Sequence, residues 1–332
     1  MIEKIVVVVK KTPQEELVER VGTKAQARFL LRQESARLAP QGIRGLDFEE
    51  YDAEDAAYQS ALAALRRALP QDVRVQYIEK SFLPTFSFGE RELVVVLGPD
   101  GLVVNTAKYL NGQPIFAINP DPGRIEGVLL PFNLDDLRIG RLEQAVQERL
   151  PARSMTMAEA ALADGQTLRA VNDLFIGRKS HASARYRLEW NGNGEDQSSS
   201  GIIVSTGAGS TGWLRSLAVG ACGLAAAMRG DPEPDPDAVA ARTRLDWEAS
   251  ILSFCVREPW PSRVTSASLL YGQVTPGTEL TIISQMPQDG VIFSDGIEND
   301  YLEFGSGAVA RIGVSDRRVN LLVAASVSNG GR

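Results

Sequence analysis

The chain has 332 residues, of which 44% are hydrophobic and 23% are charged, and its formal net charge at pH 7 is −7. This composition is typical of a folded globular protein and excludes a disordered or fibrous chain. The acidic balance, without a concentrated basic stripe, argues against a nucleic acid or an anionic membrane as partner. A single histidine, His181, excludes a histidine-rich zinc site, and Cys222 and Cys255 are predicted to be free, buried thiols.

The longest apolar runs, such as residues 5–9, are far too short to span a bilayer. The first of these runs begins within a few residues of Met1, which leaves no room for a basic leader and a cleavage site. A cytoplasmic protein is therefore expected.

Strand and helix signals alternate in the first part of the chain. Residues 3–9 are a β-branched run of the kind found in strands buried on both faces. Thr12 and Pro13, followed by an acidic stretch, predict a helix N-cap and first turn, with helix to about residue 34 and a break near Gly22. Further helices are predicted over residues 52–69 and 104–110, and further strands over 73–78, 93–97 and 115–118. This alternation predicts a parallel sheet with crossover helices.

After about residue 140 the pattern changes to short alternating segments separated by Gly, Pro and Asn. These segments predict mostly antiparallel β structure, interrupted by one helix over residues 211–228. The tract 231–237 is predicted to be a stiff acidic loop. The predicted strands cover residues 168–176, 184–190, 201–205, 250–256, 279–284, 290–293 and 303–312. The fold class is therefore α/β followed by β, with a Rossmann-like first domain and a β-rich second domain.

The first motif with chemical potential is Gly98-Pro99-Asp100-Gly101, which follows a buried strand and precedes a helix. In open α/β sheets, ligands bind beyond the carboxyl ends of the strands, where loop amides and helix N-termini face anions. Gly98 and Gly101 allow close approach of a phosphate, and Asp100 is suited to act as a base or as a metal partner. The alternative is a plain β-turn, because Pro-Asp-Gly is a common turn sequence.

The second motif is the loop Ser205-Thr206-Gly207-Ala208-Gly209-Ser210-Thr211-Gly212, between a strand and a helix that includes Trp213. Its backbone amides and hydroxyl groups form a dense cluster of donors and acceptors, as sugars and phosphates require. A flexible loop in which Ser210 or Thr211 caps the helix is the alternative.

Two shorter motifs follow the same logic. Asn172 and Asp173 are adjacent in a predicted strand, so their side chains point to opposite faces. Both can therefore contact one ligand only where the strand twists or ends. The alternative is that they cap a strand edge. Asp295-Gly296 follows an apolar run and by itself predicts a type I′ hairpin turn.

Basic residues gather at two places. Arg178, Lys179, His181, Arg185 and Arg187 form a local excess that is typical of a solvated hairpin face, with contact to a phosphate as the alternative. Later in the chain, Arg257 and Arg263 flank a rigid Pro-Trp-Pro segment in which Trp260 is predicted to pack, and contact of the two arginines with a ligand is left open.

Taken in order, these motifs resemble the NAD kinase family. That family has a Gly-Gly-Asp-Gly loop after a strand, an Asn-Glu pair, a Thr-x-x-Gly-Ser-Thr-Ala-Tyr loop and a late Asp-Gly. The matching segments here are Gly98-Pro99-Asp100-Gly101, Asn172-Asp173, the loop from Thr206 to Trp213, Asp295-Gly296 and, for the family's Gly-Val-Asn strand end, Ala117-Ile118-Asn119.

The divergent branch that includes the mitochondrial NAD kinase is the most similar. The segments that resemble it are residues 119–127, Phe175-Ile176-Gly177, Ser199-Ser200-Gly201 and Arg257-Glu258-Pro259. The resemblance extends over residues 93–322.

The resemblance implies ATP- and Mg²⁺-dependent phosphorylation of the 2′-hydroxyl of the adenosine ribose of NAD, by positioning and charge neutralisation. It implies Asp100 as the catalytic residue, with Gly98, Gly101 and Asn119 against nucleotide phosphates. The residues implied to bind NAD are Asn172, Asp173, Thr206, Gly209, Ser210, Thr211 and Asp295. A homodimer or higher homo-oligomer, without nucleic-acid or membrane partners, is also implied.

The resemblance further implies three segments. Residues 1–138 form the Rossmann-like domain, residues 139–315 the β-rich NAD-binding domain, and residues 316–332 a segment that returns to the first domain.

Four departures from the family pattern keep alternatives open. Pro99 replaces a glycine and removes a backbone N–H that could bind phosphate, and Leu102 stands where the family has a hydroxyl residue. Asp173 is one methylene shorter than the usual glutamate, and Trp213 replaces tyrosine. The alternatives are a non-catalytic or altered nucleotide-binding protein of the same fold, or a kinase for another hydroxyl, on a sugar or a lipid.

Overall fold

The computed structural model describes residues 2–38, 40 and 47–324, with the side chain of Asn299 left out. Residues 325–332 of the predicted C-terminal segment lie outside this range. The chain divides into two compact units. Of the described residues, unit 1 comprises those within 2–106, 113–152 and 321–324, and unit 2 comprises residues 107–112 and 153–320.

Unit 1 is built on the predicted parallel sheet. Its strands lie in the order β2 (Arg74–Glu79), β1 (Lys4–Val9), β3 (Glu92–Leu97) and β4 (Pro114–Ile118), and every neighbouring pair is parallel. All six residues of β3 are buried, as expected for a strand covered on both faces. The end of β16 (Val309–Leu322) follows β4 in the sheet order, and Leu321 and Leu322 belong to unit 1.

The first helices of unit 1 begin and end at the predicted signals. Thr12 caps α1 (Pro13–Val21) in a capping box with Glu15, and Gly22 ends it with a φ of 93°, which favours glycine. Two further helices, α2 (Lys24–Leu38) and α3 (Phe48–Ala68), follow.

The buried face of α3, including Tyr58 and Leu65, packs against the sheet. The hydroxyl of Tyr58 links α3 to the sheet, because it accepts the N–H of Lys10 at 3.0 Å and donates to the carbonyl of Leu97 at 3.4 Å. Unit 1 also contains η2 (Lys80–Thr85), α4 (Asp100–Ala107), α5 (Leu134–Arg138) and α6 (Arg141–Val146).

Unit 2 is β-rich, as predicted. One sheet has the order β12 (Tyr271–Val274), β11 (Leu252–Val256), β10 (Ile202–Ser205), β7 (Asp173–Arg178), β14 (Gly290–Ser294) and β15 (Ile297–Glu303). We call it the six-stranded sheet, and its neighbouring strands are all antiparallel.

The remaining strands of unit 2 follow the order β16, β13 (Leu280–Ser284), β8 (Ala184–Trp190) and β9 (Asn193–Ser199). Strand β5 (Ala152–Leu162) pairs with β16, and β6 (Thr167–Ala170) pairs with β5. Alternate side chains of both groups of strands, such as Leu174, Phe254, Tyr186 and Ile282, form the main core.

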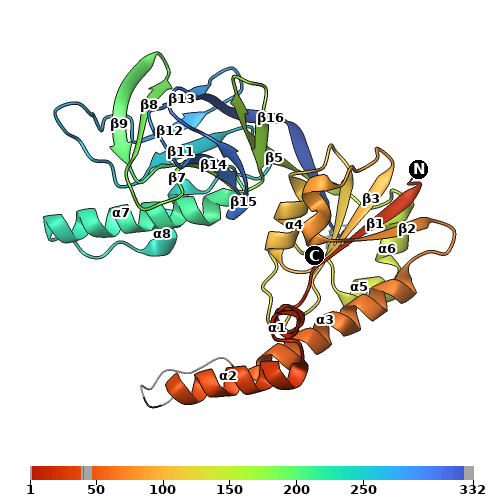
Figure 1. Ribbon diagram of the computed structural model, residues 1–332. Coiled ribbons are helices and arrows are strands. Elements are labelled where there is room, and N and C mark those ends of the chain that lie inside the picture. The colour runs from red at the N-terminus through yellow and green to blue at the C-terminus, as the bar shows by residue number, and fades with distance from the viewer. Residues whose placement is uncertain (1, 39, 41–46, 325–332) are drawn as a thin grey trace, which may run out of the picture. The chain divides into compact units, whose positions relative to one another are not determined.

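Two helices complete unit 2. Figure 1 shows α7 (Trp213–Arg229) and α8 (Pro236–Thr243) lying side by side. Only the start of α7 packs on the six-stranded sheet, through Trp213 and Leu217. Among the described residues, no helix has both the length and the apolar character needed to cross a bilayer.

Several local predictions are wrong. The predicted strand 168–176 is interrupted at Val171 and Asn172, and the predicted strand 303–312 is interrupted by a turn over residues 304–308, between the end of β15 and the start of β16. The acidic tract is a loop over residues 231–235 only, because Asp235 caps α8, which begins at Pro236. Cys222 is exposed on α7 rather than buried, since among the residues of that helix only Leu214 and Ala226 are buried.

Candidate functional site

Three segments of unit 2 meet at the carboxylate of Asp295. Asp295 lies in the predicted hairpin turn between β14 and β15, with a φ of 57°, and the φ of Gly296 is 71°. Its carboxylate accepts the backbone N–H groups of Val171, Asn172 and Asp173 at 3.1, 2.7 and 3.2 Å. The interruption between β6 and β7 therefore exposes amides that Asp295 binds. We call the meeting point of residues 171–173, 205–212 and 295 the junction.

The loop hydroxyls of the junction are used by the protein itself. Thr206 is fully buried; its hydroxyl donates to the carbonyl of Val171 and accepts the N–H of Gly209. Ser210 is 1% exposed and its hydroxyl donates to the carbonyl of Gly207 at 2.7 Å. Thr211, by contrast, is exposed, and among the described residues its hydroxyl makes one long hydrogen bond, donated to the carbonyl of Ala208 at 3.4 Å.

Glycine is required at two positions of this loop by close backbone contacts. A Cβ on Gly207 would lie 2.0 Å from the carbonyl oxygen of Asp246, and one on Gly209 would lie 2.2 Å from that of Asn172. Within the described residues, the backbone N–H groups of Gly207 and Ala208 have no hydrogen-bond acceptor. These two N–H groups are the donors that the loop offers to a ligand.

Asp173 is the most strongly perturbed acid of the junction. Its carboxylate accepts the hydroxyl of Ser205, which faces it across the β7–β10 pair. Burial, the largest cause, together with the nearby charge of Asp295, raises the pKa of Asp173 to about 7. The side chain of Asn172 makes no hydrogen bond within the part of the chain described. Asn172 and Asp173 therefore supply the side-chain groups of the junction that have spare hydrogen-bonding capacity.

A buried lysine that the sequence analysis did not single out lies beside the junction. Lys108 is 5% exposed, and its Nζ lies 2.6 Å from Asp300 and 3.4 Å from the hydroxyl of Ser294. Burial raises the pKa of Asp295 to about 6, and the three amide hydrogen bonds and Lys108 limit this rise. The sequence signal for Lys108 is a single charge in the otherwise uncharged segment of residues 101–110.

The Gly98–Gly101 loop lies in unit 1 at the carboxyl end of β3. Asp100 begins α4, and its two carboxylate oxygens accept the N–H groups of Val128 and Leu129 at 3.0 and 2.9 Å. Leu102 is 2% exposed, and a Cβ on Gly98 would lie 2.8 Å from its Cδ2. The leucine that departs from the family pattern is therefore packed beneath the loop.

Asn119 organises the neighbouring loop at the carboxyl end of β4. It is 5% exposed, its Nδ2 donates to the carbonyl of Ile125 at 2.9 Å and its Oδ1 accepts the N–H of Asp121 at 3.0 Å. Gly127 closes this loop with a φ of 68°. The predicted phosphate-side residues of unit 1 thus lie at the carboxyl ends of adjacent strands, where open α/β sheets bind their ligands.

The predicted basic groups separate in the structure. Arg178, Lys179, His181 and Arg257 line one cavity of unit 2, whereas Arg263 does not. Trp260, predicted to pack, is 70% exposed, because it lies in a surface loop in which residues 260–264 are all exposed.

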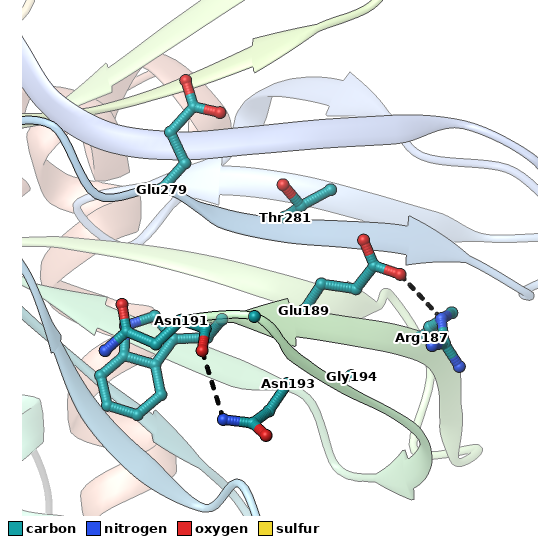
Figure 2. A pocket seen from close by; sticks show the side chains of 9 residues that line it. Arg187, Glu189, Asn191, Asn193, Gly194, Glu279 and Thr281 are labelled. Carbon is teal, nitrogen blue, oxygen red and sulfur yellow. Dashed lines mark hydrogen bonds and ion pairs between the residues drawn. The ribbon is translucent and has the colours of Figure 1, made fainter.

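A second hollow, of about 340 Å³, lies at the turn of the β8–β9 hairpin (Figure 2). Arg187 lines it together with Glu189, and the two side chains pair with each other at 2.8 Å, while Asn193 donates to the carbonyl of Asn191. Because its arginine is already paired, this hollow is a poor candidate for an anion site.

The buried hydroxyl of Thr206 is expected to stabilise the junction. Thr206→Val removes an acceptor from the N–H of Gly209 and a donor from the carbonyl of Val171, and we expect a loss of about 1–3 kcal/mol in the free energy of unfolding. Urea denaturation monitored by circular dichroism measures this loss. Thr211→Val, which changes the same hydroxyl on an exposed residue, should leave stability within about 0.5 kcal/mol of wild type; equal losses in the two variants would contradict this role.

No model of a protein family matches the chain, and no curated protein sequence matches it. Solved structures do. Yeast NADH kinase complexed with NADH is 14% identical with a TM-score of 0.54, and the match covers 98% of this chain and 84% of that one. An NAD kinase from Archaeoglobus fulgidus in complex with ATP is 17% identical with a TM-score of 0.52, covering 96% and 93%. The chain therefore shares the fold of these kinases, an α/β part followed by a β-rich part, as the resemblance implied.

Proposed function

We propose that this chain transfers the terminal phosphate of ATP to the 2′-hydroxyl of the adenosine ribose of NAD, giving NADP and ADP. The observation that carries the proposal is the junction, at which the Asn-Asp pair, the Thr-x-x-Gly-Ser-Thr loop and the late Asp-Gly come together within one unit. The shared fold supports it, because one solved relative was crystallised with NADH and another with ATP.

In this proposal the junction holds the adenosine part of NAD. The carboxylate of Asp173 and the amide of Asn172 bond to the ribose hydroxyls, and the N–H groups of Gly207 and Ala208 face acceptor atoms of the ligand. The Thr206 and Ser210 hydroxyls act indirectly, since they hold the loop rather than face outward. Gly209 and Asp295 likewise position residues 172–173, and the exposed Thr211 is free to contact the ligand.

Asp100 accepts the proton of the 2′-hydroxyl as its oxygen forms a bond to the γ-phosphorus of ATP and the bond from that phosphorus to the ADP oxygen breaks. Gly98 and Gly101 lie against the phosphates, and Asn119 fixes the neighbouring strand end. Little covalent work is required of the protein, because phosphoryl transfer depends on positioning and on neutralising charge.

The residues present fit Mg²⁺ bound together with ATP. Within the described ranges, no three carboxylate, histidine or cysteine side chains gather into a metal site. Mg²⁺ at phosphate sites, however, is usually held by one or two carboxylates and the substrate phosphates. Asp100 accepts two N–H groups and keeps further lone pairs for this purpose. When bound, Mg²⁺ neutralises the charge of the transferred phosphate.

A second candidate function is nucleotide binding without catalysis. It is favoured by Pro99, which offers no N–H, and by Leu102, whose buried side chain occupies the place of a hydroxyl beneath the loop. Incubation with ATP, Mg²⁺ and NAD, followed by chromatographic detection of NADP, separates the two functions. Formation of NADP supports the kinase. Clear NAD binding by calorimetry without NADP would refute the kinase and leave the binding protein.

The same assay tests the remaining alternative. Omission of ATP is its control, and a sugar or diacylglycerol replaces NAD in parallel reactions. ADP release with these acceptors but not with NAD would favour a kinase for another hydroxyl. The homodimer or higher homo-oligomer implied by the resemblance stays a prediction, which light scattering during gel filtration measures.

A further inference from the structure

A large cavity lies on the face of the six-stranded sheet that is turned away from the core. Its volume is about 790 Å³, within the range of about 300–1,000 Å³ usual for small-molecule sites. Phe175, Trp213, Phe293 and Tyr301 line it together with Lys179 and Arg257. Phe175 follows Asp173 by two residues and so lies on the same face of β7, about 7 Å further along the strand. The cavity is thus adjacent to the junction and separate from it.

The floor of the cavity is flat and aromatic. The ring of Phe175 covers Gly177 and Gly201, where an added Cβ would lie 2.5 and 2.8 Å from ring atoms. Its neighbours are Trp213, stacked at a centroid distance of 6.0 Å with an interplanar angle of 6°, and Phe293 at 4.7 Å. Such a floor favours a planar ring as ligand.

Two cations of the cavity lack a close carboxylate partner. Lys179 Nζ lies 3.4 Å from the centroid of the Tyr301 ring and forms no ion pair within the described residues. Arg257 packs against the Trp213 ring at 5.4 Å, and its Nε is buried without a hydrogen-bond partner. A buried N–H of this kind is costly unless an acceptor binds it.

The remaining charged side chains that line the cavity do not neutralise the charges of Lys179 and Arg257. Arg178 is already paired with Asp289 at 2.5 Å. Glu258 is 70% exposed in its side chain and lies 3.9 Å from Arg257, too far for a hydrogen bond, and Glu298 is also exposed. His181, the single histidine, is exposed at the rim. Lys179, which is exposed, and Arg257 therefore remain available to bind an anion.

We propose that this cavity binds a ligand that joins an aromatic ring to a phosphate: its ring lies on the Phe175–Trp213–Phe293 floor and its phosphate accepts hydrogen bonds from Lys179 and Arg257. Two sources share this chemistry, a free nucleotide and the nicotinamide half of a dinucleotide whose adenosine half occupies the junction. The binding itself does not depend on catalysis at Asp100.

Titration of the full chain with nicotinamide mononucleotide, by calorimetry and without ATP, tests the proposal. We expect saturable binding that weakens as salt increases, and a loss of about tenfold or more in affinity for Lys179→Ala and for Arg257→Ala. The matched control is Arg185→Ala, because Arg185 is an exposed arginine of the same unit that does not line the cavity. Thermal melting of all variants excludes unfolding as the cause.

No heat with the wild-type chain, or equal affinities for the wild-type chain and both cavity variants, would overturn the proposal. Where binding occurs, repeating the titration with NAD at saturation distinguishes the two sources: competition identifies the dinucleotide half, and simultaneous binding identifies a free nucleotide. Failure of this binding test can be told apart from failure of the kinase assay, since nicotinamide mononucleotide carries no adenosine ribose and the titration contains no phosphoryl donor.

Discussion

Asp100→Asn is expected to lower the rate of NADP formation by about 10²–10⁴-fold while NAD still binds with nearly unchanged affinity. An amide cannot accept the proton of the 2′-hydroxyl, and it offers one acceptor oxygen where the carboxylate offers two. Steady-state kinetics with ATP and NAD measure the rate, and calorimetry with NAD alone measures the affinity.

The control for this experiment addresses the second task of Asp100, which is to bind the N–H groups of Val128 and Leu129. Gly127→Ala disturbs the same loop without removing the carboxylate, because Gly127 has a φ of 68° and an added Cβ would lie 2.7 Å from Asn119 Nδ2. It should lower thermal stability yet retain turnover within about tenfold. Comparable loss of turnover in the two variants would make Asp100 a positioning residue, and unchanged turnover in Asp100→Asn would remove it from the mechanism.

Asp173→Asn is expected to raise the KM for NAD by about ten- to a hundredfold, because a charged acceptor for the ribose hydroxyls is lost. The pKa of Asp173 is raised to about 7, so the wild-type carboxyl is ionised mainly above that pH. The KM of the wild-type chain should therefore fall as pH rises from 6 to 8. The KM of the variant should change little over the same range.

The same substitution is expected to stabilise the protein at high pH. The folded state holds the proton of Asp173 more tightly than the unfolded state between the ordinary pKa of 3.8 and about 7, so stability falls as pH rises through this window. Above about pH 7, Asp173 is ionised in both states, and its buried carboxylate lowers the free energy of unfolding by the full amount. Asp173→Asn should then add about 2–4 kcal/mol to the free energy of unfolding at pH 8 and almost nothing at pH 4.

Asp164→Asn is the matched control for both measurements, because Asp164 is an exposed carboxylate of the same unit, in a turn outside the junction. The KM of the Asp164→Asn variant for NAD and the pH dependence of that KM should both equal those of the wild-type chain. A stability gain for Asp173→Asn that is the same at pH 4 and pH 8 would show that its charge is not the cause.

Signals that act within a few residues could be interpreted from the sequence. Thr12, Pro13 and Glu15 predict the start of α1, and Gly22 its end, because a capping box and a positive φ depend only on neighbouring residues. The β-branched runs predict buried parallel strands, and Asp295-Gly296 predicts a hairpin turn. The order of the four motifs along the chain predicts the fold, which the solved relatives share.

Long-range packing decided the elements that the sequence analysis missed. Strand β5 has a composition rich in Ala and Met that does not favour a strand, and its pairing with β6 and β16 places it in the sheet. The Gly-Ser-Gly turn after β15 likewise divides what alternation predicts to be one strand over residues 303–312. The alternation of apolar and polar residues indicates which face of a sheet a residue occupies, but it does not indicate where the chain turns.

The sequence by itself determined which residues are the candidates for the chemistry: the carboxylates Asp100, Asp173 and Asp295 and a loop rich in hydroxyl groups. Only the tertiary structure decided how each group is used. It directs Asp295, Thr206 and Ser210 toward backbone groups of the junction, and leaves Asp173 buried with a raised pKa. The physical reason is that burial and several of these hydrogen bonds depend on residues far apart in the sequence, such as Asp295 and Asn172 or Thr206 and Val171, and no local pattern records those distances.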